Sequence, residues 1–239
     1  MAVRLRIAVG STAILGLVGR DSSGYRPLLG ERVRGPAVLV IALAIIVIVV
    51  FGMRYADQDM PGHLDRSLDA LIRHALHREQ PITAALVGLG NPGQATVLVA
   101  AVAGAAAIAR RWAGVLLTIV GTVTAVAITD LILKPLIGRL SYGHLSFPSG
   151  HTTVVAAVAF ATAILIAGAR WPRSMILRLV VGLAAVAVAV CVAISLVALR
   201  VHYATDTVAG YCVALATVLA VAFCLDFFGP RFRRSPLQQ

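Results

Sequence analysis

Three short segments of the 239-residue chain concentrate the residue types that bind phosphate. They are Lys134 to Arg139, the run Phe-Pro-Ser-Gly-His at 147–151, and Arg200 to Asp206. Lysine and arginine pair with phosphate oxygens, and a serine–glycine pair at the beginning of a helix presents backbone N–H groups to an anion. We therefore predict a phosphate site made of Lys134, Arg139, Ser149, Gly150 and Arg200.

The same segments contain two histidines and an aspartate that suit phosphoryl transfer. His202 and Asp206 are four residues apart, so on a helix they share a face. The carboxylate can then bind one imidazole nitrogen and leave the other as a nucleophile, while His151 protonates the leaving oxygen. These roles divide ester hydrolysis into two steps through a phosphohistidine. No metal-ligand cluster accompanies these residues, so we predict a metal-independent reaction without a cofactor.

The elements that must position these residues are membrane-spanning helices. Hydrophobic residues make up 59% of the chain and charged residues 13%, against about 45–50% and 25% in soluble domains. A helix needs roughly 20 apolar residues to cross a bilayer. Six stretches reach or approach this length: 37–53, 94–109, 112–133, 151–169, 177–199 and 205–228. The second is the weakest and is expected to begin before Gln94. The prediction is an all-α bundle of six transmembrane helices, with the three polar segments at the outer ends of the last four.

The net charge of +11 predicts the orientation of this bundle. With six spans, the N-terminal segment, the loops after the second and fourth spans and the C-terminal tail share one side, which carries 14 arginines and three acidic residues. The other side carries seven basic and seven acidic residues. By the positive-inside rule the arginine-rich side is cytoplasmic. Both termini are then cytoplasmic, the polar segments are extracytoplasmic, and no nucleic-acid partner is needed to explain the charge.

Outside the spans, the chain is expected to have three further parts. Residues 1–36 form a cytoplasmic or interfacial segment, residues 229–239 a basic cytoplasmic tail, and residues 54–83 an outer loop of the membrane domain 37–228. Residues 61–78 of this loop are predicted to form an amphipathic helix, because apolar residues recur there at helical spacing with charges between them. We expect this helix to lie on the outer membrane surface with its apolar face towards lipid.

Several residues near these motifs receive a structural interpretation. Asp130, one helical turn before Lys134, is interpreted as a supporting ion-pair partner of Lys134 or of an arginine. Tyr203 is assigned to the aromatic belt at the membrane interface. His74 and His77 in the outer loop are interpreted as solvated histidines.

These segments resemble the signatures of the type-2 phosphatidic acid phosphatase superfamily, K-x6-R-P, P-S-G-H and S-R-x5-H-x3-D. The second is complete at 148–151, the third keeps Ser195, His202 and Asp206 in register, and the first keeps Lys134, the only lysine of the chain. The resemblance implies the roles of nucleophile for His202, orienting residue for Asp206 and general acid for His151. It also implies that Lys134, Ser149 and Gly150 bind phosphate.

Two departures from the family pattern concern arginines. Ser141 occupies the position of the first-signature arginine, and Leu196 that of the third-signature arginine. Arg139 lies two residues before the first vacant position, and Arg200 lies one helical turn beyond the second. We predict that both reach the same phosphate from these shifted positions. The alternative is a divergent site with weakened phosphate binding.

The resulting hypothesis is a phosphatase of the bacterial inner membrane that hydrolyses a lipid phosphate or diphosphate at the extracytoplasmic face. The resemblance implies polyprenyl diphosphate, phosphatidic acid, phosphatidylglycerol phosphate or a phosphorylated prenyl-sugar as substrate, and polyprenyl diphosphate is preferred over phosphatidic-acid-like lipids. One alternative is a non-catalytic protein that binds or transports an anionic lipid with a degenerate site. Another is a vanadate-dependent oxidase, for which a soluble architecture would be expected.

Overall fold

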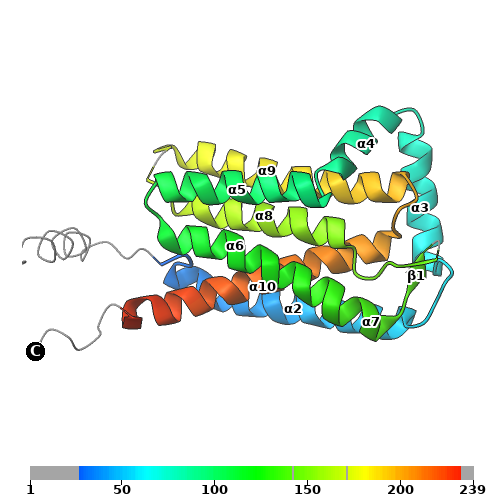
Figure 1. The fold of residues 1–239 in the computed structure, drawn as a ribbon, viewed down its shortest axis with the longest axis horizontal. Helices are drawn as coiled ribbons and strands as arrows, with labels where there is room; N and C mark the ends of the chain where they lie inside the picture. Colours follow the sequence, from blue (N-terminus) through cyan, green and yellow to red (C-terminus); the bar gives the residue numbers. More distant parts are fainter. Residues whose placement is uncertain (1–26, 142, 171, 233–239) are drawn as a thin grey trace, which may run out of the picture.

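The computed structural model of the chain describes residues 27–141, 143–170 and 172–232. With labels as in Figure 1, the elements are α2 (Glu31–Tyr55), α3 (His63–Leu76), α4 (Gln80–Gly88), α5 (Pro92–Ile108), α6 (Trp112–Ala127), the π-helical turn η1 (Ile128–Leu133), α7 (Lys134–Ile137), β1 (Leu140–Ser141), β2 (His144–Leu145), α8 (Gly150–Ala167), α9 (Met175–Ala198) and α10 (Ala204–Phe232).

Among the described residues, five helices are long and apolar enough to cross a membrane: Glu31–Tyr55, Trp112–Ile137, Gly150–Ala167, Met175–Ala198 and Ala204–Phe228. The number of spans is six if α4 and α5, which are bent by 63° at a short break, count as one. The second predicted span does begin before Gln94, at Pro92. Figure 1 shows the long helices running side by side, with α3 and α4 at the end of the bundle where α7 and β1 also lie.

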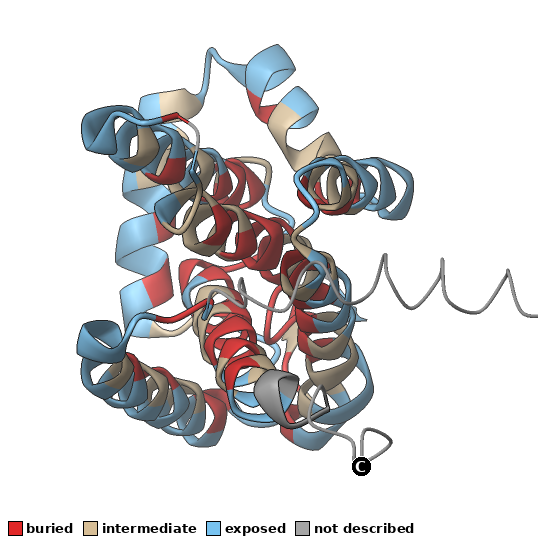
Figure 2. Cartoon of the chain, turned by 90° about the vertical axis from the view of Figure 1, so that its left-hand side faces the viewer, coloured by how far each residue is buried: buried red, intermediate tan, exposed pale blue. Residues whose placement is uncertain are grey.

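The interior of the bundle is built from small residues. Helix α8 packs against α6, α9 and α10, and the alanines at its centre, Ala156, Ala157 and Ala161, are fully buried. Small side chains let helix backbones approach closely in a membrane, where packing replaces the hydrophobic driving force between helices. Figure 2 shows the buried segments at the centre of the bundle and the exposed ones around it. The close packing holds the ends of α8, α9 and α10 in fixed relative positions.

Several boundaries differ from the sequence-based expectation. The first helix begins at Glu31 instead of residue 37, and the last extends to Phe232. Residues 31–36 of the predicted N-terminal segment and residues 229–232 of the predicted tail are therefore helical and continue the first and last helices. Residues 1–26 lie outside the described part, and the side of the membrane on which the termini lie stays a prediction. The small antiparallel ladder that pairs Leu140 with Leu145 was not expected in an all-α chain.

The amphipathic helix of the outer loop is confirmed as α3, but two of its acidic residues pack against the protein. Asp65 and Asp69 are 0% and 1% exposed. Leu64, Leu68 and Leu71 on the adjoining side of the helix are 52%, 44% and 66% exposed. The acidic stripe therefore meets the bundle, and the leucine stripe is left for the lipid contact that the sequence predicts.

Candidate active site

The three polar segments converge at one end of the bundle. They are contributed by the η1–α7 turn with the loop after it, by the beginning of α8, and by the connection between α9 and α10. The convergence brings the rings of His151 and His202 to a centroid separation of 6.5 Å, with 58° between their planes. The two predicted catalytic histidines therefore face a common space from different helices.

His202 and Asp206 adopt the pairing that their spacing predicts. Nδ1 of His202 lies 3.6 Å from Oδ2 of Asp206, which is ion-pair range but longer than a hydrogen bond. No hydrogen-bond partner for this buried Nδ1 exists among the described residues. Hydrogen bonds of catalytic groups are often long without substrate and shorten in the reacting complex. The Asp206 carboxylate itself is fully buried, and Arg139 and the backbone N–H of Tyr203 donate hydrogen bonds to it.

His151 contacts the break between α4 and α5. Its Nε2 lies 3.1 Å from the amide oxygen Oδ1 of Asn91, and the ring nitrogen is the donor because a carbonyl oxygen only accepts. Gly90 makes this contact possible, since a Cβ there would lie 2.7 Å from Cδ2 of His151. The Gly-Asn-Pro run at 90–92 marks a helix break in the sequence, but nothing in the sequence places that break beside His151.

Lys134 lies beside the beginning of α8. Its Nζ forms an ion pair of 2.8 Å with Oδ1 of Asp130, which confirms the pairing interpreted from the sequence. A Cβ at Gly150 would lie 3.2 Å from Oδ1 of Asp130 and 3.6 Å from Nζ of Lys134. Both side chains come from the π-helical turn and its end, a distortion that is frequent at functional sites. One ammonium group and the N-terminus of an 18-residue helix thus meet at Gly150.

Ser149 connects the beginning of α8 with that of α10. Its hydroxyl caps α8 by accepting from the backbone N–H of Thr152 at 3.3 Å, and its own backbone N–H donates to the carbonyl of Asp206 at 3.0 Å. Gly210 permits this close approach, because a Cβ there would lie 2.7 Å from the carbonyl oxygen of Ser149. A capping hydroxyl that accepts still has its own proton to donate. The phosphate-binding role of Ser149 stays a prediction.

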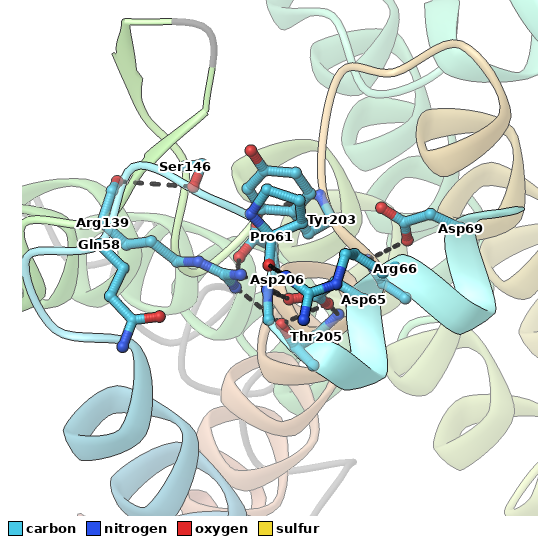
Figure 3. A network of polar contacts seen from close by, with 12 residues as sticks. Gln58, Pro61, Asp65, Arg66, Asp69, Arg139, Ser146, Tyr203, Thr205 and Asp206 are labelled. Atoms are coloured by element: carbon cyan, nitrogen blue, oxygen red, sulfur yellow. Dashed lines mark hydrogen bonds and ion pairs between the residues drawn. The ribbon is translucent and has the colours of Figure 1, made fainter.

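Arg139 does not face the space between the histidines. It is fully buried, and its NH1 donates to Oδ1 of Asp206 at 2.6 Å and to Oγ1 of Thr205 at 2.7 Å. Its NH2 donates to Oδ2 of Asp65 at 2.5 Å, and the network is drawn in Figure 3. This geometry argues against the predicted replacement of a missing phosphate-binding arginine by Arg139, because both terminal nitrogens already bind carboxylates.

Two tyrosine rings enclose the same guanidinium group. The guanidinium carbon of Arg139 lies 4.3 Å from the ring centroid of Tyr55 and 4.6 Å from that of Tyr203. Stacking of this kind is favourable when the cation is removed from water. Tyr203 is buried, so its assignment to the interfacial aromatic belt was wrong.

Asp65 and Asp69 are site residues that the sequence analysis missed. Oδ1 of Asp65 accepts from the backbone N–H and the hydroxyl of Thr205 at 3.0 and 2.8 Å. Oδ1 of Asp69 accepts from the backbone N–H of Ala204 at 3.1 Å. Burial raises the pKa of Asp69 to about 6; the neighbouring Asp65 carboxylate adds to this rise and the Ala204 amide opposes it. Their spacing of four residues was the available signal, but it also fits a solvated helix face.

Arg200 occupies the connection between α9 and α10 that also carries His202. It is exposed and has a left-handed backbone with a φ of 60°, a conformation that is uncommon outside glycine. In the part of the chain that the structure describes, its side chain makes no hydrogen bond or ion pair. Its predicted contact with phosphate stays a prediction. Among the described residues, no group of three or more His, Cys, Asp and Glu could hold a metal ion.

The fold and the site together define a class of protein, namely multi-pass membrane proteins with a His–His–Asp set at the helix ends. The sequence model of the type-2 phosphatidic acid phosphatase (PAP2) superfamily matches residues 36–229, and the chain belongs to this superfamily. This confirms the resemblance drawn from the motifs. Family and fold identify the chain as a phosphatase-type hydrolase, which supports lipid phosphate hydrolysis in general.

The fold is similar to that of a solved relative. It matches the crystal structure of a transmembrane PAP2-type phosphatidylglycerolphosphate phosphatase from Bacillus subtilis, with a TM-score of 0.60 and 20% sequence identity. The match covers 84% of this chain and 98% of that one. No curated protein sequence matches the chain. At this identity the match establishes the shared fold, and the substrate has to be argued from the site.

Proposed function

We propose that the protein hydrolyses a lipid phosphate or diphosphate at the extracytoplasmic face of the bacterial inner membrane, through a phosphohistidine on His202. The observation that supports this most strongly is the 6.5 Å separation of the His151 and His202 rings, with the Asp206 carboxylate behind His202. Lys134 and the first turn of α8 supply positive potential beside them. The preferred substrate is a polyprenyl diphosphate, with phosphatidic-acid-like lipids as the alternative.

The reaction proceeds in two displacements. In the first, the free imidazole nitrogen of His202 bonds to phosphorus, the bond from phosphorus to the lipid-side oxygen breaks, and His151 gives that oxygen a proton. In the second, His151 takes a proton from water, the water oxygen bonds to phosphorus, and the phosphorus–nitrogen bond breaks to release inorganic phosphate. Asp206 stabilises the positive charge that forms on His202, as the carboxylate partner of a histidine does in other two-step hydrolases.

An apolar groove next to the site supports a lipid substrate. The groove has a volume of about 450 Å³ and lies between α3, α9 and α10; its lining includes Leu68, Ile72, Val197, Ala204, Thr207 and Val208. Ala204 and Thr207 belong to the first turn of α10, which also carries Asp206. Each methylene group buried there would contribute about 0.8 kcal/mol to binding. A hydrocarbon chain is the substrate part that such a surface favours.

Phosphate release by the purified protein in detergent tests this function. With a metal chelator present, we expect release from a member of a panel of polyprenyl diphosphate, phosphatidic acid and phosphatidylglycerolphosphate. His202→Ala should abolish turnover, and His151→Ala should reduce it by about 10²–10⁴-fold. The exposed His63 offers a matched control, and His63→Ala should retain wild-type activity. Wild-type activity in His202→Ala would refute the mechanism, whereas release from no lipid would favour the non-catalytic alternative.

A further inference from the structure

We propose that Asp65 on the outer helix α3 is a positioning residue of the active site. It acts through Arg139 on Asp206, and through the first turn of α10 on the segment that carries His202. The inference rests on the proposed function and deepens it, since it makes the outer helix part of the catalytic arrangement. Asp65 itself touches neither His202 nor the space between the histidines in any contact that the structure records.

The first link is the guanidinium group of Arg139, which joins two fully buried carboxylates. NH2 binds Asp65 and NH1 binds Asp206, at 2.5 and 2.6 Å. Burying an arginine is tolerable only when it is paired and hydrogen-bonded, and breaking such a pair leaves an uncompensated buried charge, which is strongly destabilising. The two carboxylates therefore depend on one cation, and a change at Asp65 is transmitted to Asp206.

The two oxygens of Asp206 have different partners. Oδ1 binds Arg139, while Oδ2 accepts from the backbone N–H of Tyr203 at 3.1 Å and lies 3.6 Å from Nδ1 of His202. Arg139 thereby prevents the carboxylate from rotating and keeps Oδ2 directed at the imidazole. The position of Arg139 is in turn fixed by its second carboxylate, which is Asp65.

The second link is the beginning of α10. The residue before this helix is Tyr203, whose side chain cannot accept a hydrogen bond from the first turn as Ser, Thr, Asp or Asn would. Asp65 and Asp69 supply the missing acceptors from another helix, for the N–H groups of Thr205 and Ala204. Helix α3 thus fixes the direction in which α10 begins, immediately after His202.

The decisive variant is Asp65→Asn, which preserves side-chain size and removes one negative charge. Arg139 then has Asp206 as its only anionic partner, so Asp206 compensates less of the positive charge on His202. We expect kcat to fall by about 10–100-fold, by analogy with the loss of residues that orient metal-ligating histidines, with KM changed less than about threefold. Asp59 in the preceding loop is exposed. Asp59→Asn is the matched control, because it removes the same charge and should leave kcat and KM unchanged.

The pH dependence separates positioning from folding. The recorded partner and neighbour of His202 are Asp206 on α10 and His151 on α8, and Lys134 and Asp130 face the adjoining turn of α8. Loss of the Asp65 charge should move the acidic limb of kcat/KM to lower pH, because a more positive surrounding disfavours protonated histidine. Reduced folding alone lowers the rate at every pH and leaves the limb in place. An unchanged limb and kcat within twofold of wild type would overturn the inference.

Two further measurements, on Thr205→Ala and on the ring resonances of His202, test the positioning role if Asp65→Asn does not fold or the wild type is inactive. If Asp65→Asn does not fold, Thr205→Ala removes the hydroxyl that joins Asp65 and Arg139 and should lower kcat by about 3–10-fold with the same direction of shift. If the wild type releases phosphate from no lipid, the proposed function fails, but the ring resonances of His202 can still be titrated by nuclear magnetic resonance in histidine-labelled protein. A titration midpoint that is the same in wild type and Asp65→Asn would then contradict the positioning role.

Discussion

Asp69 provides a test of how α3 packs, because its acidic residues Asp65 and Asp69 face the protein. Its carboxyl group is 1% exposed and accepts from the backbone N–H of Ala204. Burial raises its pKa from an ordinary value of 3.8 to about 6, with the Asp65 carboxylate adding to the rise. The Ala204 amide and Arg73, whose guanidinium lies 3.6 Å away, oppose it but do not cancel it.

The sign and size of the effect on stability follow from this pKa. A carboxyl group whose pKa is higher in the folded state binds its proton more tightly when folded. Its contribution to folding is therefore greatest below pH 3.8 and is lost as the pH rises through about 6. Each unit of pKa difference corresponds to about 1.4 kcal/mol, so ionised Asp69 lowers the free energy of unfolding by about 3 kcal/mol at neutral pH. Asp69→Asn removes this loss, because its amide oxygen still accepts from Ala204.

Thermal unfolding in detergent between pH 4.5 and 8, followed by circular dichroism, measures this effect. The stability of Asp69→Asn relative to wild type should rise with pH and level off above about pH 7, with roughly 2–4 °C in Tm for each kcal/mol. Asp59→Asn, which changes an exposed carboxylate of the same loop, should show no such trend. A difference between Asp69→Asn and wild type that does not change with pH would refute the burial of this carboxyl group.

Two further substitutions test the site around the histidines. Gly90→Ala places a Cβ 2.7 Å from Cδ2 of His151, so His151 or the α4–α5 break must move, and we expect an activity loss of about 10-fold or more. Gly93→Ala is its control because its Cβ meets nothing within 4 Å, and equal activity in the two variants would contradict the contact. Asp130→Asn removes the anion that pairs with Lys134 at 2.8 Å and should strengthen inhibition by inorganic phosphate about 3–10-fold. Weaker inhibition would instead show that Asp130 holds Lys134 in its working position.

The convergence of the three polar segments was predictable because the membrane and helix geometry restrict where their residues can lie. In a chain with 13% charged residues, ionisable groups at helix ends are costly in lipid and tend to gather where they have partners. The four-residue spacing of His202 and Asp206 and the capping position of Ser149 follow from helix geometry alone. These local rules made the convergence of the three segments predictable.

Sequence periodicity could not predict which side of the outer helix α3 faces the bundle. Periodicity identified the leucine stripe of α3, but it does not say whether protein or lipid covers that stripe. In a soluble domain the apolar face packs inwards, whereas at a membrane surface lipid can cover it and acidic residues beside it can pack against the bundle. The burial of Asp65 and Asp69 depends on partners on α10 and on Arg139, which no neighbouring sequence reveals.

The direction that Arg139 takes has a backbone reason. Gly138 before it has a left-handed conformation, with a φ of 66° that favours glycine, and a side chain there would collide with Oδ1 of Asp57. The turn directs Arg139 towards Asp65 and Asp206, as Figure 3 shows. A count of residues along the signature placed Arg139 near the phosphate, but it could not foresee the change of direction at Gly138.

The most direct test of the account is to look for phosphate bound to His202. Wild-type protein is mixed with substrate labelled in the phosphate, quenched with alkali within one turnover because phosphohistidine is unstable in acid, and analysed by peptide mass spectrometry. We predict label on His202 that decays as inorganic phosphate appears, and no label in His202→Ala. Full turnover with no phosphate on His202 at any time, or label that persists on another residue in His202→Ala, would contradict it.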